Sequence, residues 1–238
     1  MLDLKGPQKL LVIAPHPDDE VIGCAGLIQK VKQNKGKVYV LFLTVGDTND
    51  FSKTGSSSLT ARKKEIEKVS EFLEYDDYDI AFEGDDYHLK LDKLGQKKLM
   101  DVIERESKVS IEKIKPTIVV FPSASSYNQD HRIAALATHA ALRPSNKESK
   151  HFVPSILKYE EAADLWSTEE KRSPDVLVSL SEAEINTKLK ALRLYKSQDR
   201  PAPNTRSAKV LESLSILRGS QAGTQYAEGF ISHRLILN

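Results

Sequence analysis

Hydrophobic runs and amphipathic segments alternate along the first two thirds of this chain. Runs of consecutive apolar residues predict buried strands over Lys9–Ala14, Val38–Thr44 and Thr117–Phe121, with a weaker strand over Tyr78–Phe82. Segments with helical spacing of apolar positions lie between them, over Asp19–Asn34, Thr60–Glu74, Leu91–Lys113 and His131–Leu142. Strands that alternate with helices in this way are typical of a mostly parallel sheet covered on both faces.

The last third of the chain is less regular but contains the same kinds of element. We predict strands over Ser155–Tyr159, Asp175–Leu180 and Gly229–Leu237, a helix over Ser181–Ser197 that opens with a capping box, and a short helix over Val210–Arg218. No repeat or long linker divides the chain, so residues 1–238 are expected to form a single domain. The predicted fold class is α/β: a three-layer α/β/α sandwich with a Rossmann-like, mostly parallel sheet and a smaller C-terminal cap region.

Polar residues follow two of the predicted buried strands directly. The first strand ends in His16-Pro17-Asp18-Asp19-Glu20, and the strand Thr117–Phe121 is followed by a polar loop that ends in Asn128-Gln129-Asp130-His131. In open α/β sheets, ligands bind beyond the carboxyl ends of the strands, so both groups are expected at one edge of the sheet. This placement makes them candidates for a functional site.

A histidine and a carboxylate three residues apart can converge on one divalent metal, as His16 and Asp19 are spaced. The carboxylate between them, Asp18, could then act on a metal-bound water. His131 is the best candidate for a third protein ligand, with Asp130 beside it to orient the ligand or a catalytic group. Two histidines, one carboxylate and an open position form the ligand set of a catalytic zinc site, although the same set also suits Fe²⁺.

Each group also has a purely structural interpretation. The acids after the first strand could be ordinary residues of a helix N-terminus, stabilised by the helix dipole. Likewise, Asp130 could be a helix N-cap and His131 a surface residue in the first turn. The two groups together favour the metal site over these interpretations.

These residues carry a family resemblance. Pro15-His16-Pro17-Asp18-Asp19-Glu20-Val21-Ile22-Gly23-Cys24, followed by Asn128-Gln129-Asp130-His131-Arg132, resembles the motifs of the PIG-L/LmbE-like zinc-dependent N-deacetylases. Weaker similarities to the family extend along the chain, at Leu59–Glu65, Asp86–Leu89, Leu194–Gln198 and Tyr226–Phe230. The resemblance implies an enzyme that removes acetyl groups from N-acetylglucosaminyl compounds and related amino sugars.

The resemblance also implies a role for individual residues. His16, Asp19 and His131 would be the zinc ligands, and Asp18 the general base. Arg62 and Asp86 would bind substrate hydroxyls. Asn128 stands where some members of the family have a histidine that stabilises the oxyanion, so its amide would take that part and Asp130 would support catalysis. Ala25 and Tyr87 replace glycines that are common in the family.

Composition limits the other possibilities. Hydrophobic residues make up 39% and charged residues 29% of the 238 residues, and the formal net charge is +1. This balance favours neither nucleic acid nor a membrane surface as a partner, and the apolar runs are too short to span a bilayer. One cysteine and the lack of a signal-peptide pattern at the start are compatible with the cytoplasm. We therefore expect a cytoplasmic enzyme with a small-molecule substrate, and a homo-oligomer remains open.

Two other functions stay open from the residues alone. A phosphoesterase could use the same carboxylates, although a two-metal site normally needs acids and histidines from more strand ends than these two. A catalytically degenerate binding protein of the same fold is the second alternative. No Gly-x-Gly-x-x-Gly or Walker A motif follows the first strand, which argues against nucleotide binding of those kinds.

Overall fold

The computed structural model describes residues 6–50, 55–146, 148–168 and 173–236. Its centre is a 7-stranded sheet in the order β5-β2-β1-β6-β7-β9-β8. The strands are β1 (Lys9–Ala14), β2 (Lys37–Val45), β5 (Asp77–Glu83), β6 (Ile118–Phe121), β7 (Ser155–Tyr159), β8 (Val176–Leu180) and β9 (Tyr226–Leu235). A short antiparallel pair, β3 (Thr48–Asn49) and β4 (Ser56–Ser57), stands apart from this sheet. The predicted end of the last strand, Leu237, lies outside the described residues.

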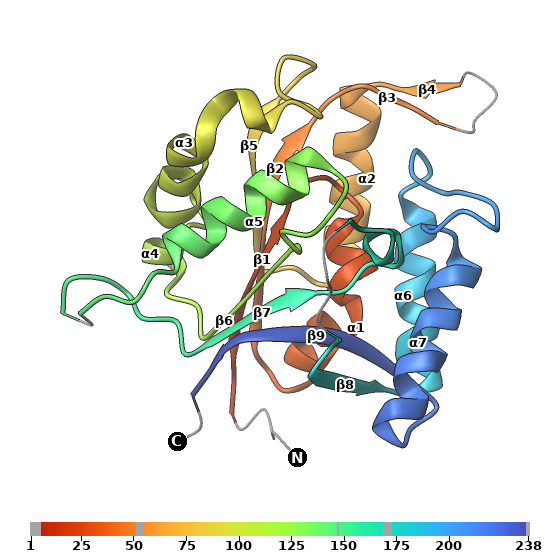
Figure 1. Cartoon of the computed structure of the whole chain (residues 1–238). Helices are drawn as coiled ribbons and strands as arrows, with labels where there is room; N and C mark the ends of the chain where they lie inside the picture. Colours follow the sequence, from red (N-terminus) through yellow and green to blue (C-terminus); the bar gives the residue numbers. More distant parts are fainter. Residues whose placement is uncertain (1–5, 51–54, 147, 169–172, 237–238) are drawn as a thin grey trace.

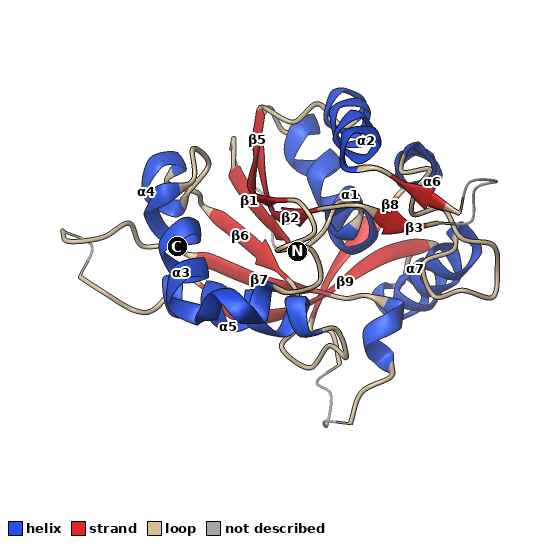
Figure 2. Ribbon diagram, turned by 90° about the horizontal axis from the view of Figure 1, so that it is seen from above, coloured by secondary structure: helices blue, strands red, loops and turns tan. Residues whose placement is uncertain are grey.

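Helices cover both faces of the sheet, as Figures 1 and 2 show. One face carries α1 (Asp19–Gln33), α2 (Leu59–Phe72), α6 (Glu182–Leu194) and α7 (Ala208–Ala222). The other carries α3 (Gly95–Asp101), α4 (Ile111–Ile114) and α5 (Gln129–Ala141). Side chains of β1 alternate between the two layers, so Leu10 and Val12 join one hydrophobic cluster while Leu11 and Ile13 join the other. The predicted three-layer α/β/α arrangement is confirmed.

The sheet changes direction of winding between β1 and β6. β1 pairs in parallel with β2 on one side and with β6 on the other, with Leu10 opposite Val38 and Ile118. The chain leaves β1 through α1 towards β2, and it leaves β6 through a loop to α5 on the opposite face. The carboxyl ends of β1 and β6 therefore frame a crevice of the kind in which doubly wound proteins bind ligands.

The C-terminal third is part of the main sheet, which differs from the expectation of a separate cap region. β9 pairs antiparallel with β7 and with β8, while the other pairs of the sheet are parallel. Two segments of this third extend towards the carboxyl ends of the strands and line the cavity described below, one at residues 161–164 and one at residues 198–206. Helix α6 is shorter than the helix predicted over Ser181–Ser197, and α7 is longer than the helix predicted over Val210–Arg218. Helix α7 is ended by Gly223, whose backbone is left-handed (φ 68°).

The single helix predicted over Leu91–Lys113 is wrong. The structure divides this segment into a 3₁₀ turn (Leu91–Leu94), α3, a π-helical turn (Val102–Glu106) and α4. The break lies at Ser107 and Lys108, which both bind the Asp79 carboxylate of β5. Ser107 Oγ donates a hydrogen bond of 2.6 Å to this carboxylate, and the backbone N of Lys108 donates one of 3.2 Å. The helix therefore ends because a side chain distant in sequence binds its polar groups.

Helix α1 bends at Cys24, whose backbone (φ −152°, ψ 23°) is not helical. At the bend, backbone N–H and C=O groups of the helix lack their usual partners within the helix, and two buried side chains form hydrogen bonds with them instead. Glu228 of β9 accepts hydrogen bonds from the backbone N of Gly26 (2.7 Å) and of Leu27 (2.9 Å). Lys188 of α6 donates to Ile22 O and to Glu228, both at 2.7 Å. The second half of α1 thus begins with a carboxylate cap that comes from another element.

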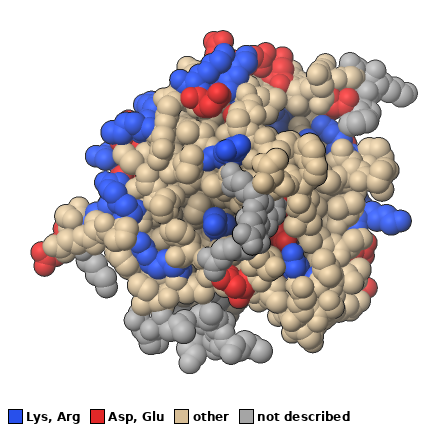
Figure 3. Space-filling view, viewed as in Figure 1, with Lys and Arg blue, Asp and Glu red and all other residues tan. Residues whose placement is uncertain are grey.

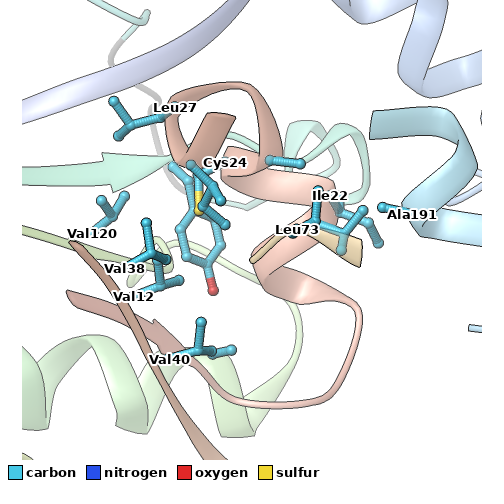
Figure 4. Packing of buried hydrophobic residues seen from close by; sticks show 14 of the residues in the cluster. Val12, Ile22, Cys24, Leu27, Val38, Val40, Leu73, Val120 and Ala191 are labelled. Atoms are coloured by element: carbon cyan, nitrogen blue, oxygen red, sulfur yellow. The ribbon is translucent and has the colours of Figure 1, made fainter. Parts of the chain in front are cut away.

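The surroundings of the bend are apolar and tightly packed. Figure 4 shows Cys24 among Val12, Val38 and Val40 of the neighbouring strands, and its thiol is free and buried. A Cβ at Gly23 would stand 2.5 Å from the ring of Tyr159, so only glycine permits this approach of helix and strand.

Charged side chains spread over the outer surface. On the face shown in Figure 3, basic side chains collect along the left edge, on the side that carries α3 and α4. Among the charged residues of the chain, Lys98 pairs with Glu106 and Lys108 pairs with Asp77, both at 2.7 Å. Paired charges of this kind are typical of a solvated surface, and the absence of a nucleic-acid partner stays a prediction. Within the described ranges, no helix combines the length and the apolar character needed to cross a membrane.

Candidate active site

The turn between β1 and α1 brings three acids and a histidine together in a small space. His16 N donates a 2.8 Å hydrogen bond to Asp19 Oδ2, which folds the turn back on itself. Asp18 takes a left-handed backbone (φ 126°, ψ −27°) that favours glycine, and it is 1% exposed. A strained non-glycine residue at the end of a buried strand is a recurrent property of functional sites.

Three side chains converge where a metal ion would fit. Asp19 Oδ2 lies 3.5 Å from His16 Nδ1 and 3.3 Å from His131 Nε2, and all three residues are buried. Zinc holds nitrogen and oxygen ligands at about 2.0–2.1 Å in a tetrahedron, which separates neighbouring ligand atoms by about 3.3–3.4 Å. The structure thus brings together the three residues that the sequence selected as metal ligands, with atoms of suitable type and spacing, and their role as ligands stays a prediction.

Asp130 supports His16 rather than its sequence neighbour. Its Oδ2 lies 3.0 Å from His16 Nε2, and its Oδ1 accepts a 2.9 Å hydrogen bond from Leu91 N. Burial alone would lower the pKa of His16, but the hydrogen bonds and charges of Asp130 and Asp19 raise it to about 9. Of the two roles expected for Asp130, orienting His131 or orienting another group of the site, its contacts fit the second, since its carboxylate binds His16, whereas His131 Nδ1 lies 4.0 Å from Glu161.

Asn128 is the N-cap of α5. Its Oδ1 accepts a 2.9 Å hydrogen bond from Asp130 N, so Asp130 and His131 stand inside the first turn and are buried. The alternative in which Asp130 caps the helix and His131 is a surface residue is therefore wrong. Asn128 lines the cavity, and because its oxygen is used for the cap, the amide nitrogen is the part left for a ligand.

Asp18 has one oxygen that is bound and one that is not. Oδ2 lies 3.4 Å from Arg206 NH1, whereas Oδ1 is buried without a hydrogen-bond partner among the described residues. Burial and the neighbouring Asp19 carboxylate raise the pKa of Asp18 to about 6, against the lowering effect of Arg206. A carboxylate with a free oxygen and a pKa near neutrality can accept and return a proton.

Glu20, the third acid of the motif, has a structural role. It is fully buried and accepts hydrogen bonds from Asp18 N (3.1 Å), Tyr75 OH (3.2 Å) and Tyr195 OH (2.5 Å). Burial raises its pKa to about 8. These bonds tie the strained turn at Asp18 to α6 and to the end of α2, so Glu20 positions the site without lining its cavity.

A second pair of buried polar atoms lies behind His131. Its Nδ1 is 4.0 Å from Glu161 Oε1, and neither atom has a hydrogen-bond partner among the residues that the structure describes. Burial and the charges of Asp19 and Asp164 raise the pKa of Glu161 well above its usual range. Glu161 therefore stands behind the imidazole of His131 as Asp130 stands behind that of His16, but the distance is 4.0 Å instead of 3.0 Å.

Arg62 and His88 form one wall of the site. Arg62 is 1% exposed, and its guanidinium donates to Gly46 O (3.3 Å) and Pro17 O (3.4 Å) and lies 3.2 Å from His88 Nε2. Burial, with the positive charges of His16 and Arg62 beside it, lowers the pKa of His88 to about 3 and keeps it neutral. Both residues line the cavity, and the binding of substrate hydroxyls by Arg62 stays a prediction.

Asp86 is not brought to the site. It is exposed and does not line the cavity, whereas its neighbour Asp85 accepts a 3.0 Å hydrogen bond from Asp47 N. The turn thus presents His88 to the cavity and braces it through Asp85, while Asp86 faces solvent.

The cavity over these groups measures about 390 Å³. Its walls include four residues that sequence reasoning did not select, namely Glu161, Asp164, Arg200 and Arg206. No local pattern marks them, since each is a single charged residue in the less regular last third of the chain. A doubly wound sheet, a buried His-Asp-His group at its switch point and a cavity above it together form a candidate active site whose side chains could hold a metal ion.

Residues 11–142 match the profile of the family named for GlcNAc-PI de-N-acetylase, PIG-L. This match covers more than half of the chain, so the protein belongs to the PIG-L family. The matched range includes the whole of the ligand group and ends with α5.

Individual relatives cover nearly the whole chain. Diacetylchitobiose deacetylase of Thermococcus kodakarensis is 27% identical over 231 residues, which are 93% of this chain and 82% of that protein. The crystal structure of N,N'-diacetylchitobiose deacetylase from Pyrococcus horikoshii is similar with a TM-score of 0.69 and 22% identity, over 97% of this chain and 87% of that one. The structure of GalB, a 4-carboxy-2-hydroxymuconate hydratase from Pseudomonas putida, is also similar, with a TM-score of 0.67 and 20% identity over 97% and 98% of the chains. The fold is therefore shared by enzymes of more than one reaction type, and the reaction has to be argued from the site.

Proposed function

We propose that the protein is a metal-dependent hydrolase that removes the acetyl group from the amide nitrogen of an N-acetylated sugar or sugar conjugate. The observation that carries the proposal is the group of His16, Asp19 and His131 beside Asp18, which lines the same cavity and whose Oδ1 has no hydrogen-bond partner among the described residues. Membership of the PIG-L family and the similarity to diacetylchitobiose deacetylases support the choice of reaction and of substrate class.

We propose zinc as the metal, with Fe²⁺ as an ion that the same ligands also fit. His16 would bind through Nδ1, His131 through Nε2 and Asp19 through Oδ2, the three atoms that converge in the structure. Asp130 would hold His16 in the required orientation from its far nitrogen, as carboxylates commonly do for metal-bound histidines. A divalent ion held there would polarise the acetyl carbonyl and make the attacking water more acidic.

Asp18 supplies the proton transfers in this proposal. Its free Oδ1 takes the proton from the water that attacks the acetyl carbon, while Arg206 holds Oδ2 in place. The protonated carboxyl then gives this proton to the departing amine nitrogen, and the C–N bond breaks to leave a free amine and acetic acid, which releases its own proton to the solvent as acetate. A pKa of about 6 suits both steps, since the group is ionised at neutral pH and still basic enough to accept a proton.

Two polar walls complete the proposed site. The amide nitrogen of Asn128 can donate a hydrogen bond to the oxygen on which negative charge develops during the attack. Arg62, with His88 against its guanidinium, offers donors to the hydroxyl groups of the sugar on the opposite wall. The substrate is thus held between α5 and α2, with the acetyl group over the His-Asp-His group.

The experiment that tests this proposal combines metal analysis with acetate release. Protein purified without added metal is assayed for bound zinc and iron, and then for acetate released from N-acetylglucosamine and N,N'-diacetylchitobiose. We expect about one metal ion per chain, lost in His131→Ala, and saturable acetate release. Asp18→Asn should retain the metal and lose activity by a factor of at least about 10².

Asp92→Asn is the matched control, because this carboxylate is exposed and lies outside the cavity. It should keep both metal and activity. Phosphate release from phosphomonoesters without acetate release would favour a phosphoesterase instead. Protein that binds no metal even after addition of zinc or iron would contradict the proposed mechanism and favour a binding protein.

A further inference from the structure

Two aromatic side chains are exposed beside the cavity. Trp166 is 81% exposed and Tyr127 is 57% exposed, and their ring centroids lie 6.2 Å apart with planes inclined by 58°. A soluble chain seldom leaves two large aromatic rings in water next to each other unless they bind something. The pair therefore needs an explanation that the metal centre does not provide.

Hydrogen bonds hold the two rings in position. Ser167 Oγ donates a 2.8 Å hydrogen bond to Ser125 O, which ties the segment of Trp166 to the loop of Tyr127. On that loop, Ser126 Oγ accepts a hydrogen bond of 3.2 Å from Asn128 N, at the start of α5. The pair is thus connected to the same helix that carries His131, and its place relative to the metal centre is set by the backbone.

The aromatic pair borders a second hollow next to the first. This hollow, of about 330 Å³, is lined by three serines and a threonine, by Arg132 and by the two rings. Ser126 and Tyr127 also line the main cavity, so the two spaces share a wall. A molecule longer than one unit could occupy both at once.

The lining of the second hollow suits a sugar ring. A pyranose presents apolar C–H groups on its faces and hydroxyl groups around its edge, which match aromatic faces and a rim of serine and threonine hydroxyls. We propose that Tyr127 and Trp166 form a second sugar subsite, which selects oligosaccharides over monosaccharides. The acetylated unit would occupy the main cavity and the neighbouring unit would stack on the aromatic pair. This inference rests on the proposed function for the identity of the first unit.

Trp166 is the only tryptophan of the chain, so its fluorescence reports on the subsite directly. Metal-loaded protein with Asp18→Asn is titrated with N,N'-diacetylchitobiose, which this variant cannot consume. We expect a saturable shift of the emission to shorter wavelengths as the indole leaves water. N-acetylglucosamine at equal saturation should leave the emission unchanged, and Tyr127→Ala should weaken disaccharide binding by about tenfold.

Kinetics give an independent measurement. In Trp166→Ala, the ratio of kcat/KM for the disaccharide to kcat/KM for the monosaccharide should fall by about tenfold, mainly through KM. Trp166→Phe should restore most of the ratio, since it keeps an aromatic face. Phe72→Ala is the control, because this ring is also exposed but ends α2 outside both hollows.

The outcomes separate the subsite from the proposed function. Saturable emission shifts without acetate release from either sugar would support the subsite and contradict the deacetylase. Acetate release with unchanged emission and an unchanged ratio in Trp166→Ala would overturn the subsite alone. An emission shift that depends on protein concentration, without sugar, would assign the aromatic pair to a contact between two copies of the chain and also overturn it.

Discussion

Removing the carboxylate of Glu228 should destabilise the protein strongly, although this residue lies outside the site. In Glu228→Ala, the backbone N–H groups of Gly26 and Leu27 lose their acceptor and Lys188 loses its counter-charge. The side chains of Lys188 and Glu228 are only 4% and 2% exposed, so bulk water has little access to the groups that lose their partner. The change leaves a buried ammonium group beside two unpaired amides.

The size of the effect follows from this geometry. Breaking a buried ion pair by removing one partner costs about 3–5 kcal/mol, and the two unpaired amides favour the upper end of that range. Whole domains are stable by about 5–15 kcal/mol, so the variant loses a large part of its stability. For a chain of this length, we expect the midpoint of thermal unfolding to fall by about 6–20 °C.

Urea unfolding of wild type and variants measures this loss, with the midpoint and the slope fitted separately. The double variant Lys188→Met with Glu228→Leu should recover the share of the lost stability that comes from the unpaired Lys188 charge, because a buried ion pair can be replaced by apolar groups at little cost. It should remain about 1–3 kcal/mol less stable than wild type, since the amides of α1 stay unpaired.

Lys63→Ala is the matched control. Lys63 and Glu83 form an ion pair of 2.9 Å, similar in length to the buried pair, but their side chains are 41% and 43% exposed. Its loss should cost at most about 1 kcal/mol. If Glu228→Ala were no more destabilising than this control, the argument that the bent helix depends on a buried carboxylate would be refuted.

Four further predictions concern the site. The proton that His16 holds with a pKa of about 9 must leave before a metal binds, so zinc affinity should rise about tenfold per pH unit up to about pH 9, with proton release detectable by calorimetry in different buffers; affinity independent of pH would contradict this. Because Asp18 must be ionised to accept a proton and its pKa is raised to about 6, kcat/KM should fall as the pH drops through about 6, and a profile flat down to pH 4.5 would exclude it as the base. Glu161→Ala should weaken metal binding by about 10–100-fold in equilibrium dialysis, with Glu161→Gln intermediate, if the carboxylate supports His131 from behind; equal affinities in all three proteins would argue against that role. Asp86→Asn should change kcat/KM by less than about twofold, because the side chain is exposed outside the cavity, and a tenfold loss would restore the role that the family resemblance implies.

The predictable part of this structure is the part encoded locally. β1 and β6 could be identified because each is an unbroken apolar run, and His16 and Asp19 because they follow such a run with a spacing of three residues. The rule that parallel strands end at one edge then placed His131 beside them, although more than a hundred residues intervene.

The parts that were missed depend on contacts that no local pattern encodes. The helix expected over residues 91–113 breaks because Asp79, on a neighbouring strand, binds the polar groups at Ser107. Arg62 could be selected only through the family resemblance, because its local pattern is that of a surface residue and its place in the wall depends on the carbonyl groups of Gly46 and Pro17. Glu161 and Arg206 become part of the site only because the last third of the chain closes over the strand ends.

The backbone of Asp18 has a consequence for the history of proteins that share this motif. Holding a non-glycine residue at φ 126° costs about 1–3 kcal/mol, a cost that the chain bears as long as the carboxylate is needed. Glycine at this position would relieve the strain at once and would make the fold more stable. In a lineage that no longer requires the reaction, mutation should therefore favour glycine here early, before the ligands themselves are lost. The residue at this one position would then separate working enzymes from relatives that have kept only the shape.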